Sequence, residues 1–153
     1  MWSIIITTIA VSKTSIACDL QATHGGGFKF KVKTKLFEFN NPLFYPTPFT
    51  VGYSGDLDAV PDVLDFLANP EQSAKPPRNR NCEFVVLTKD HKIYTFINPT
   101  KWILVDEPNY AIGSGMHYAL GALKAGATPK EAVKAACKLD PMSGLGVKEI
   151  SYL

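Results

Sequence analysis

The chain has 153 residues and a mass of 16.8 kDa, with 46% hydrophobic, 11% aromatic and 20% charged residues. This size and balance indicate one domain with its own core, and they exclude a disordered, collagen-like or coiled-coil chain. Sixteen Lys and Arg residues against fourteen Asp and Glu residues give a net charge of only +2, which supplies no strong field for binding nucleic acid or an anionic membrane.

The cysteine, histidine and hydropathy patterns indicate which cofactors and which cellular compartment to expect. The three cysteines are odd in number and show no CxxC or CxxH spacing, and the three histidines share no metal-ligand spacing. The apolar residues 1–11 are too short to cross a bilayer and lack the basic region and cleavage site of a signal peptide. We therefore expect a cytoplasmic protein with no disulfide framework, metal, cofactor, membrane or nucleic-acid partner.

The spacing of apolar residues predicts the strands and the helix of the first half of the chain. Residues 3–11 are almost all β-branched or apolar, as in a strand that is buried on both faces. Residues 28–39 alternate with period two and place four lysines on one face, of which we expect the first three to be solvent-exposed. The fourth, Lys35, is kept apart as a candidate site residue. Pro61 fits only the first turn of a helix, so the apolar spacing up to Leu67 predicts a helix that begins near this proline.

Capping residues define the last third more sharply. Ser114 opens a helix that Gly126 ends, and Thr-Pro-Lys-Glu at 128–131 has the pattern of a capping box that opens a second helix. The complete order is strands at 3–11, 15–18, 28–39 and 50–53, a helix near 61–67, a loop at 69–81, strands at 83–88 and 92–97, helices at 114–125 and from 128 to a break at 140–144, and a strand at 147–152. This order predicts an α+β domain of antiparallel sheets with helices on their outer faces.

Common catalytic signatures such as GxxxxGK[ST], GxGxxG, HExxH and GxSxG are absent. Three other segments nevertheless form a pattern: Thr-Thr-Ile at 7–9, Asp-Leu-Gln-Ala-Thr at 19–23 and Ala-Ile-Gly-Ser-Gly at 111–115. In this order they resemble the proteasome β-subunit superfamily, which includes the peptidase subunit of the bacterial two-component ATP-dependent protease. The tail, with Tyr-Ala-Leu-Gly-Ala at 118–122, is most similar to short bacteriophage and prophage homologues.

The resemblance implies a fold and a chemistry. The fold is the N-terminal-nucleophile (Ntn) hydrolase αββα sandwich, a four-layer arrangement of two antiparallel sheets between two helix layers, spanning 1–153 as a single domain. In this superfamily a threonine hydroxyl attacks the peptide carbonyl, and the free α-amine of the same residue serves as its base. By position, the resemblance implies seven site residues: Thr7 as nucleophile, Asp19 as the carboxylate after the second strand, Lys35 as the lysine, Gly52 as the oxyanion glycine, Ser114 in the glycine-flanked motif, and Asp140 with Ser143 on the other side of the nucleophile.

Activity requires a free amine on the nucleophile, so residues 1–6 must be removed if Thr7 has that role. Ser3, sixteen residues before Asp19, is the alternative nucleophile, although the Thr-Thr-Ile match favours Thr7. Two hypotheses follow. The first is a threonine peptidase that cleaves itself before Thr7 and acts on polypeptides within a homo-oligomeric ring, with an unfoldase as a candidate partner. The second is a catalytically silent structural or assembly protein of a phage particle, in which residues 1–6 extend the first strand and virion proteins are the partners.

Overall fold

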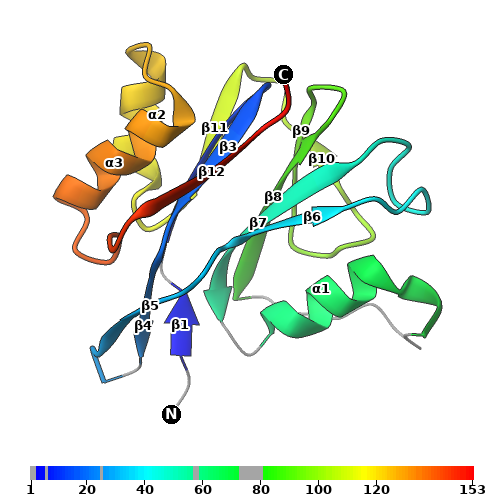
Figure 1. Ribbon diagram of the computed structural model, residues 1–153, viewed down its shortest axis with the longest axis horizontal. Coiled ribbons are helices and arrows are strands. Elements are labelled where there is room, and N and C mark those ends of the chain that lie inside the picture. The colour runs from blue at the N-terminus through cyan, green and yellow to red at the C-terminus, as the bar shows by residue number, and fades with distance from the viewer. Residues whose placement is uncertain (1–2, 6, 25, 57–58, 73–80) are drawn as a thin grey trace.

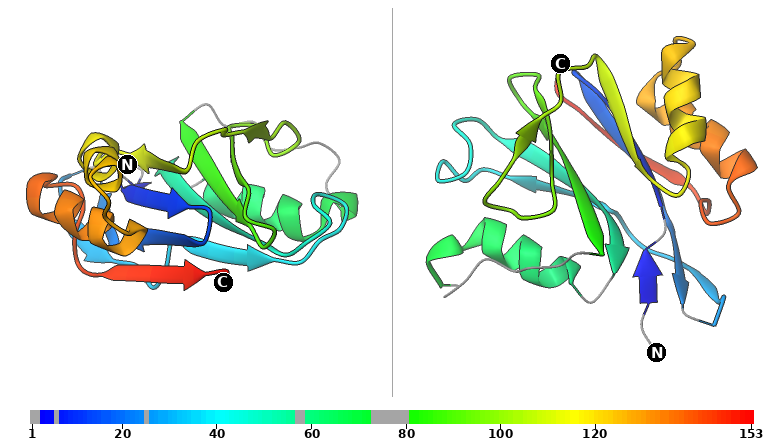
Figure 2. Two further views of the ribbon diagram at one scale, coloured as in Figure 1. Left: turned by 90° about the horizontal axis from the view of Figure 1, so that it is seen from above. Right: turned by 180° about the vertical axis from the view of Figure 1, so that it is seen from behind.

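The polypeptide folds into four layers, with a helix layer on each outer side and two antiparallel sheets between them (Figure 1). The structure is a computed structural model that describes residues 3–5, 7–24, 26–56, 59–72 and 81–153. Two helices cover the smaller sheet and one covers the larger sheet, as the further views also show (Figure 2). They are α2 (Met116–Lys124), α3 (Pro129–Leu139) and α1 (Val60–Ala68). This arrangement confirms the predicted α+β fold.

The smaller sheet is built on a hairpin near the start of the chain. Its strand order is β11-β2-β3-β12, and all neighbouring pairs are antiparallel. Ile9 pairs with Cys18 and Val11 pairs with Ile16, so the turn lies at residues 13–14, between the strands predicted at 3–11 and 15–18. The four strands are β2 (Thr8–Ser12), β3 (Ser15–Asp19), β11 (Asn109–Gly113) and β12 (Val147–Ser151).

The larger sheet has eight strands in the order β10-β9-β8-β7-β1-β4-β5, and β6 also pairs with β7. Along one edge of β7, β6 pairs with its first half and β1 pairs with its last residues, while β8 runs along the other edge. The strands are β1 (Ser3–Ile5), β4 (Gln21–His24), β5 (Lys29–Lys31), β6 (Leu36–Phe39), β7 (Phe49–Asp56), β8 (Cys82–Thr88), β9 (Ile93–Phe96) and β10 (Ile103–Leu104).

The prediction of one strand over residues 3–11 is wrong, because the chain changes sheets within it. Strand β1 lies in the larger sheet between β4 and β7, whereas β2 lies in the smaller sheet. The return strand changes sheets in the same way, since β3 ends at Asp19 and β4 begins at Gln21 in the larger sheet. Thr7 and Asp19 therefore lie side by side where the hairpin passes from one sheet to the other.

The predicted strand over 28–39 is also divided. Strand β5 pairs with β4, and β6 pairs with β7. The residues between β5 and β6 belong to neither strand. The Thr34 hydroxyl donates to the Leu36 carbonyl at 3.1 Å and accepts from the Leu36 N–H at 3.0 Å, which closes a local turn around Lys35. The turn reverses the alternation, so Lys35 is fully buried while Lys29, Lys31 and Lys33 are exposed, as predicted.

Three apolar clusters hold the layers together. Ile9, Ile112 and Val85 belong to the cluster between the two sheets. Alanines on the outer face of the smaller sheet pack against α2 and α3, and this lack of bulk lets helix and sheet approach closely. The third cluster joins α1 to the larger sheet. Among the described residues, no helix is long and apolar enough to cross a membrane.

Helix capping agrees with the sequence at one helix and differs at the other. Thr128 and Glu131 form the predicted capping box at α3, and Gly126 has the positive φ of 103° expected after α2. Ser114 was expected to cap α2, but the N-cap residue is Gly115 and the Ser114 side chain makes no capping bond. The Ser114 hydroxyl is instead directed to the site described next.

Candidate active site

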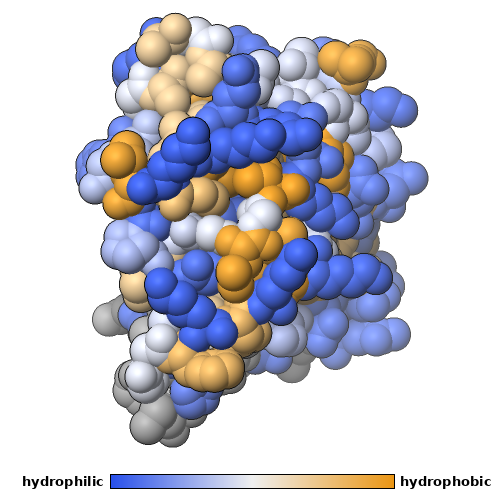
Figure 3. All heavy atoms as spheres, turned by 60° about the vertical axis from the view of Figure 1, so that its left-hand side comes forward, coloured by the Kyte–Doolittle hydropathy of each residue, from blue (hydrophilic) through white to orange (hydrophobic). Residues whose placement is uncertain are grey.

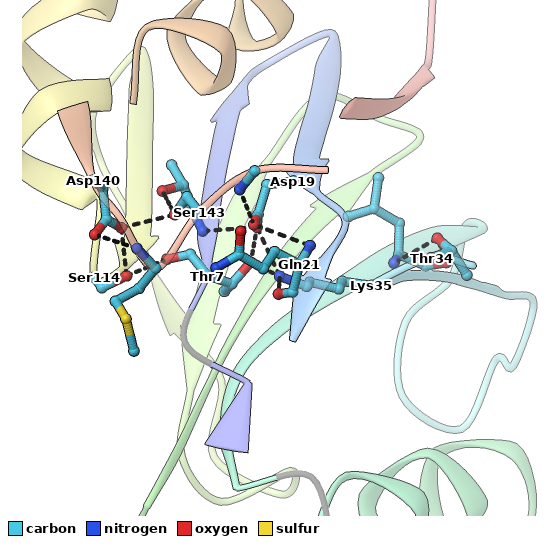
Figure 4. A network of polar contacts seen from close by, with 12 residues as sticks. Thr7, Asp19, Gln21, Thr34, Lys35, Ser114, Asp140 and Ser143 are labelled. Carbon is cyan, nitrogen blue, oxygen red and sulfur yellow. Dashed lines mark hydrogen bonds and ion pairs between the residues drawn. The ribbon is translucent and has the colours of Figure 1, made fainter. Parts of the chain in front are cut away.

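Thr7, Asp19 and Lys35 form a buried polar cluster at the point where the hairpin changes sheets (Figure 4). Thr7 precedes β2, Asp19 ends β3 and Lys35 precedes β6, and each side chain is 0% exposed. The Thr7 hydroxyl donates to Asp19 Oδ1 and accepts from Lys35 Nζ at 2.5 Å. A carboxylate and an ammonium group therefore contact the same hydroxyl and also contact each other.

The Lys35 ammonium group has three donors, and each has a partner. It donates to Thr7 Oγ1, to Asp19 Oδ1 at 2.7 Å and to the Gln21 carbonyl at 2.6 Å. Burial lowers the pKa of Lys35 below its ordinary value of 10.5, while the Asp19 charge acts in the opposite direction. The ion pair and the Gln21 carbonyl together compensate for the burial of this amine.

Asp19 is held at both of its oxygens. Oδ1 accepts from Thr7, from Lys35 and from the Thr8 N–H at 3.1 Å. Oδ2 accepts from the Gln21 N–H at 3.2 Å and from the Gly144 N–H at 3.0 Å. These backbone donors fix the carboxylate in one orientation, so Asp19 in turn fixes Thr7 and Lys35. The Gln21, Thr8 and Gly144 contacts were not predicted, because a backbone donor or acceptor leaves no residue-type signal in the sequence.

A second cluster joins Asp140, Ser114 and Ser143 beside the first (Figure 4). Asp140 Oδ2 accepts from the Ser114 hydroxyl at 2.6 Å and from the Ser143 hydroxyl at 2.8 Å. Burial raises the pKa of Asp140, but the hydrogen bonds from Ser114 and Ser143 outweigh it, so the net pKa is below the ordinary value of 3.8. The three residues come from the start of α2 and the end of α3, which pack together.

Thr8 connects the two clusters. Its N–H donates to Asp19, and its hydroxyl shares a 2.8 Å hydrogen bond with the Ser143 hydroxyl. Because the single Ser143 hydrogen is engaged with Asp140, Thr8 is the donor in this bond. A continuous chain of hydrogen bonds thus runs from Lys35 through Asp19 and Thr8 to Asp140.

The glycine-flanked motif at 113–115 is shaped to accept the Thr7 backbone. The Thr7 carbonyl accepts from the Gly115 N–H and from the Ser114 hydroxyl, both at 3.4 Å. A Cβ on Gly113 would lie 1.9 Å from the Thr7 carbonyl oxygen, and a Cβ on Gly115 would lie 1.9 Å from Thr8 Oγ1. Both glycines are therefore required by the close approach of the backbone at Thr7 and Thr8.

Six of the seven sequence-predicted site residues meet in this network, and Gly52 does not. Gly52 lies within β7, where it pairs with Leu36 of β6 on one side and with Val85 of β8 on the other. A Cβ there would contact Ile9 and Leu36 in the core between the sheets. Residues 1–6, which precede Thr7, are called the leader. The glycine of β7 that pairs with the leader is Gly55, which lies opposite Ile5 and has a φ of 126°. The strand register shows that Gly55, and not Gly52, lies opposite the leader, and residue spacing alone does not reveal this register.

The other candidate nucleophile, Ser3, lies in β1 opposite His24, and its side chain is outside the described part of the chain. The structure gives no site for a metal ion within the described ranges, where no three His, Cys, Asp or Glu side chains are grouped to bind one. Cys18 is buried beside the Lys35 backbone, and burial raises the pKa of its thiol to about 11. The raised pKa favours the protonated thiol form of Cys18.

The sequence matches no protein-family model and no curated protein. Solved structures, however, match over nearly the whole chain. HslV from Trypanosoma brucei has a TM-score of 0.71 at 18% identity, covering 94% of this chain and 98% of HslV. BPH from Thiobacillus denitrificans has a TM-score of 0.67 at 19% identity, covering 95% and 96%. A Gly-1 mutant of Anbu from a Hyphomicrobium strain has a TM-score of 0.72 at 13% identity, covering 95% and 81%. The chain therefore has the fold of the proteasome-type N-terminal-nucleophile hydrolases.

Proposed function

We propose that the protein is a threonine peptidase that hydrolyses peptide bonds with Thr7 as its N-terminal nucleophile. The observation that carries this proposal is the buried Thr7 hydroxyl, which contacts both the Lys35 ammonium group and the Asp19 carboxylate. A threonine that served packing alone would not need a buried lysine, whose desolvation is costly. Buried titratable groups around a hydroxyl are typical of an activated nucleophile.

The first step is self-cleavage between Ile6 and Thr7. The Thr7 oxygen attacks the Ile6 carbonyl carbon, the amide bond breaks as an ester to Thr7 Oγ1 forms, and the hydroxyl proton passes to the departing nitrogen. Water then hydrolyses the ester, which leaves a carboxylate on Ile6 and a free α-amine on Thr7. This step creates the base that the next reaction needs, because an α-amine has a pKa of roughly 7.7–8.0 and titrates near neutral pH.

Substrate hydrolysis repeats the same chemistry on another chain. The Thr7 amine takes the hydroxyl proton while the oxygen attacks the substrate carbonyl, and the amine then protonates the leaving nitrogen. Lys35 stabilises the negative charge that develops on Thr7 Oγ1, since its ammonium group is 2.5 Å away in a buried site. Asp140, Ser114 and Ser143 hold the Thr7 and Thr8 backbone in position from the other side.

Strand pairing around the leader supports a polypeptide substrate. Strand β1 pairs with β4 on one side and with β7 on the other, directly before Thr7. When residues 1–6 leave, the facing edges of β4 and β7 are open to a new strand. An extended peptide can occupy this position through main-chain hydrogen bonds, which do not depend on its sequence.

A catalytically silent structural protein is the second candidate, and one observation favours it. Residues 3–5 are a regular strand inside the larger sheet, with partners on both sides, rather than a segment outside the fold. In this case the leader extends the sheet permanently and the protein serves assembly. The tail motif at 118–122 supports an origin in a bacteriophage for either candidate, with the host cytoplasm or the virion as its location.

The proposal includes a homo-oligomeric ring. One solved neighbour is a helical assembly of Anbu from Pseudomonas aeruginosa, with a TM-score of 0.70 at 14% identity. BPH has also been solved in complex with epoxomicin. These names support the proposal that this chain forms an oligomeric peptidase. An unfoldase that delivers polypeptide substrate is the partner that we propose for such a peptidase.

Intact mass of the purified protein separates the two candidates. The peptidase proposal expects a chain that begins at Thr7 and gains the mass of a threonine-directed covalent inhibitor, whereas Thr7→Ala stays full-length and unmodified. Lys35→Met should also stay full-length, while Lys33→Met, which changes an exposed lysine on the same segment, should be cleaved like the wild type. A full-length wild-type mass under every assembly condition contradicts the peptidase and supports the structural protein.

A further inference from the structure

A groove of about 440 Å³ lies between α3 and the start of β12. Three lysines of α3 form one wall, and the other wall is the loop that leads into β12. Its lining residues are Lys130, Lys134, Cys137, Lys138 and Gly144 to Val147. The catalytic network described above uses none of the lysines in this wall, so they need a separate explanation.

Helical spacing places the three lysines in one row. Lys130, Lys134 and Lys138 are four residues apart, so they lie above one another on the outer face of α3. The opposite face of α3 carries Val133 and Ala136, which pack on the smaller sheet. All three lysines are exposed, and none has an ion pair in the part of the chain that the structure describes. The row is therefore an exposed positive stripe, in which the charge of Glu131 acts on Lys134 without a direct ion pair.

Apolar side chains are exposed next to this stripe. Leu145 is 47% exposed and Leu139 is 61% exposed, although both are large aliphatic residues. Leu145 also has a positive φ of 62°, a conformation that is uncommon for a non-glycine residue and a source of local strain. On this face of the molecule, hydrophilic side chains surround a patch of hydrophobic ones (Figure 3). Exposed apolar residues rimmed by charge are typical of an interaction site.

We propose that this groove is a docking site for an acidic peptide segment of a partner protein, one that alternates carboxylates with leucine-like side chains. The carboxylates would pair with Lys130, Lys134 and Lys138, and an apolar side chain would cover Leu145. A nucleic acid fits less well, because it offers phosphates but no aliphatic group for the apolar wall, and the net charge of +2 provides little general attraction. The groove shares Gly144 with the polar network around Thr7, but the proposed binding uses the lysines and Leu145 and does not depend on peptidase activity.

Fluorescence anisotropy tests the proposal with the full chain in its Thr7→Ala form, which removes any cleavage of the probe. The probe is a fluorescein-labelled decapeptide in which glutamate and leucine alternate. Saturable binding is expected, weakened about fivefold or more by Lys134→Glu and weakened again as salt rises. Leu145→Asn, which suits the positive φ but removes the aliphatic group, should also weaken it. Lys13→Glu changes the net charge equally at an exposed turn outside the groove and should leave binding unchanged.

Each contrary result overturns the proposal. Absence of saturable binding by well-folded protein removes the site. Equal losses in Lys134→Glu and Lys13→Glu show that only net charge matters, and equal binding of a probe with serine in place of leucine shows that the apolar wall is not used. Tighter binding of a ten-nucleotide oligouridylate, with the same dependence on Lys134, assigns the groove to nucleic acid instead. Circular dichroism of each variant confirms that a loss of binding is not a loss of fold.

Discussion

At the scale of single residues, Thr8 and Gly115 determine how closely the two polar clusters approach. Thr8 donates its N–H to Asp19 and its hydroxyl to Ser143, and Gly115 leaves the space that this hydroxyl occupies. Neither residue contacts the Thr7 hydroxyl itself. They set the position of the backbone on which the nucleophile is carried, so small errors here displace Thr7 from Lys35.

Gly115→Ala is expected to reduce both stability and self-cleavage. The new Cβ would lie 1.9 Å from Thr8 Oγ1 in a buried site, so the Thr8–Ser143 hydrogen bond is lost and the free energy of unfolding falls by about 1–3 kcal/mol. Gly121→Ala is the matched control, because nothing lies within 4 Å of its Cβ position on α2, and it should raise stability by about 0.8–1 kcal/mol. Urea unfolding and intact mass measure both effects, and equal behaviour of the two variants contradicts the close packing at Gly115.

The predictability of the site differs from residue to residue for physical reasons. Thr7, Asp19 and Lys35 were predicted from the resemblance to the proteasome β-subunit superfamily, and the structure brings them together. Gly52 was chosen in the same way but lies in the core, because only the pairing of β1 with β7 reveals which glycine of that strand is near the leader. Ser114 was predicted both as a site residue and as the cap of α2, and only the cap is wrong, because its hydroxyl donates to Asp140, 26 residues away.

At the scale of elements, the main surprise is that one apolar run forms two strands in different sheets. Both β1 and β2 are rich in β-branched residues, which suit a central strand of either sheet. Hydrophobic pattern therefore identifies the strands but not the sheet to which each belongs. The capping box of α3 was predictable because all of its partners lie within four residues.

Residues 1–6 are expected to stabilise the fold even when they are not covalently attached. Protein produced with Thr7 as its first residue should have a lower Tm than the full-length Thr7→Ala chain, because β4 and β7 lose the ladder that β1 provides. A synthetic peptide of residues 1–6 should raise the Tm in proportion to the logarithm of its concentration. The same peptide with Ile4→Pro is the control, since proline lacks the backbone N–H at a position that pairs on both sides. Equal effects of the two peptides contradict the strand role of the leader.

At the scale of the whole molecule, the site holds together the layers of the fold. Asp140 lies at the end of α3, Ser114 before α2, Thr8 in the smaller sheet and Lys35 before a strand of the larger sheet. The polar network therefore connects one helix layer to both sheets, and protonation of Asp140 acts on the stability of the whole fold. The layered architecture was predictable from the order of elements, whereas this connection depends on long-range contacts.

Acid is expected to remove the stability that Asp140 contributes. Its pKa in the folded state is lower than the ordinary value of 3.8, because the hydrogen bonds from Ser114 and Ser143 outweigh burial, so the unfolded state binds the proton more readily. The contribution is thus present above the ordinary pKa and is lost as pH falls through the lowered one. The difference in unfolding free energy between wild type and Asp140→Asn should shrink steadily below pH 3.8. In a Ser114→Ala background the pH range over which this free-energy difference shrinks should be narrower, because Asp140 has lost one of the hydrogen bonds that lower its pKa. A free-energy difference that is constant with pH contradicts the stabilising role of the Asp140 carboxylate.

The double pairing of β1 also separates cleavage from release. If the proposed self-cleavage takes place, breaking the Ile6–Thr7 bond would leave the pairing of residues 3–5 with β4 and β7 in place, so residues 1–6 would stay as a bound product in the position proposed for a substrate. A freshly cleaved molecule would then be mature in covalent structure yet still occupied, and its activity would begin only as fast as the fragment dissociates. Dilution, rather than further chemistry, would set the length of that delay, and rapid rebinding would make concentrated protein the slowest to become active.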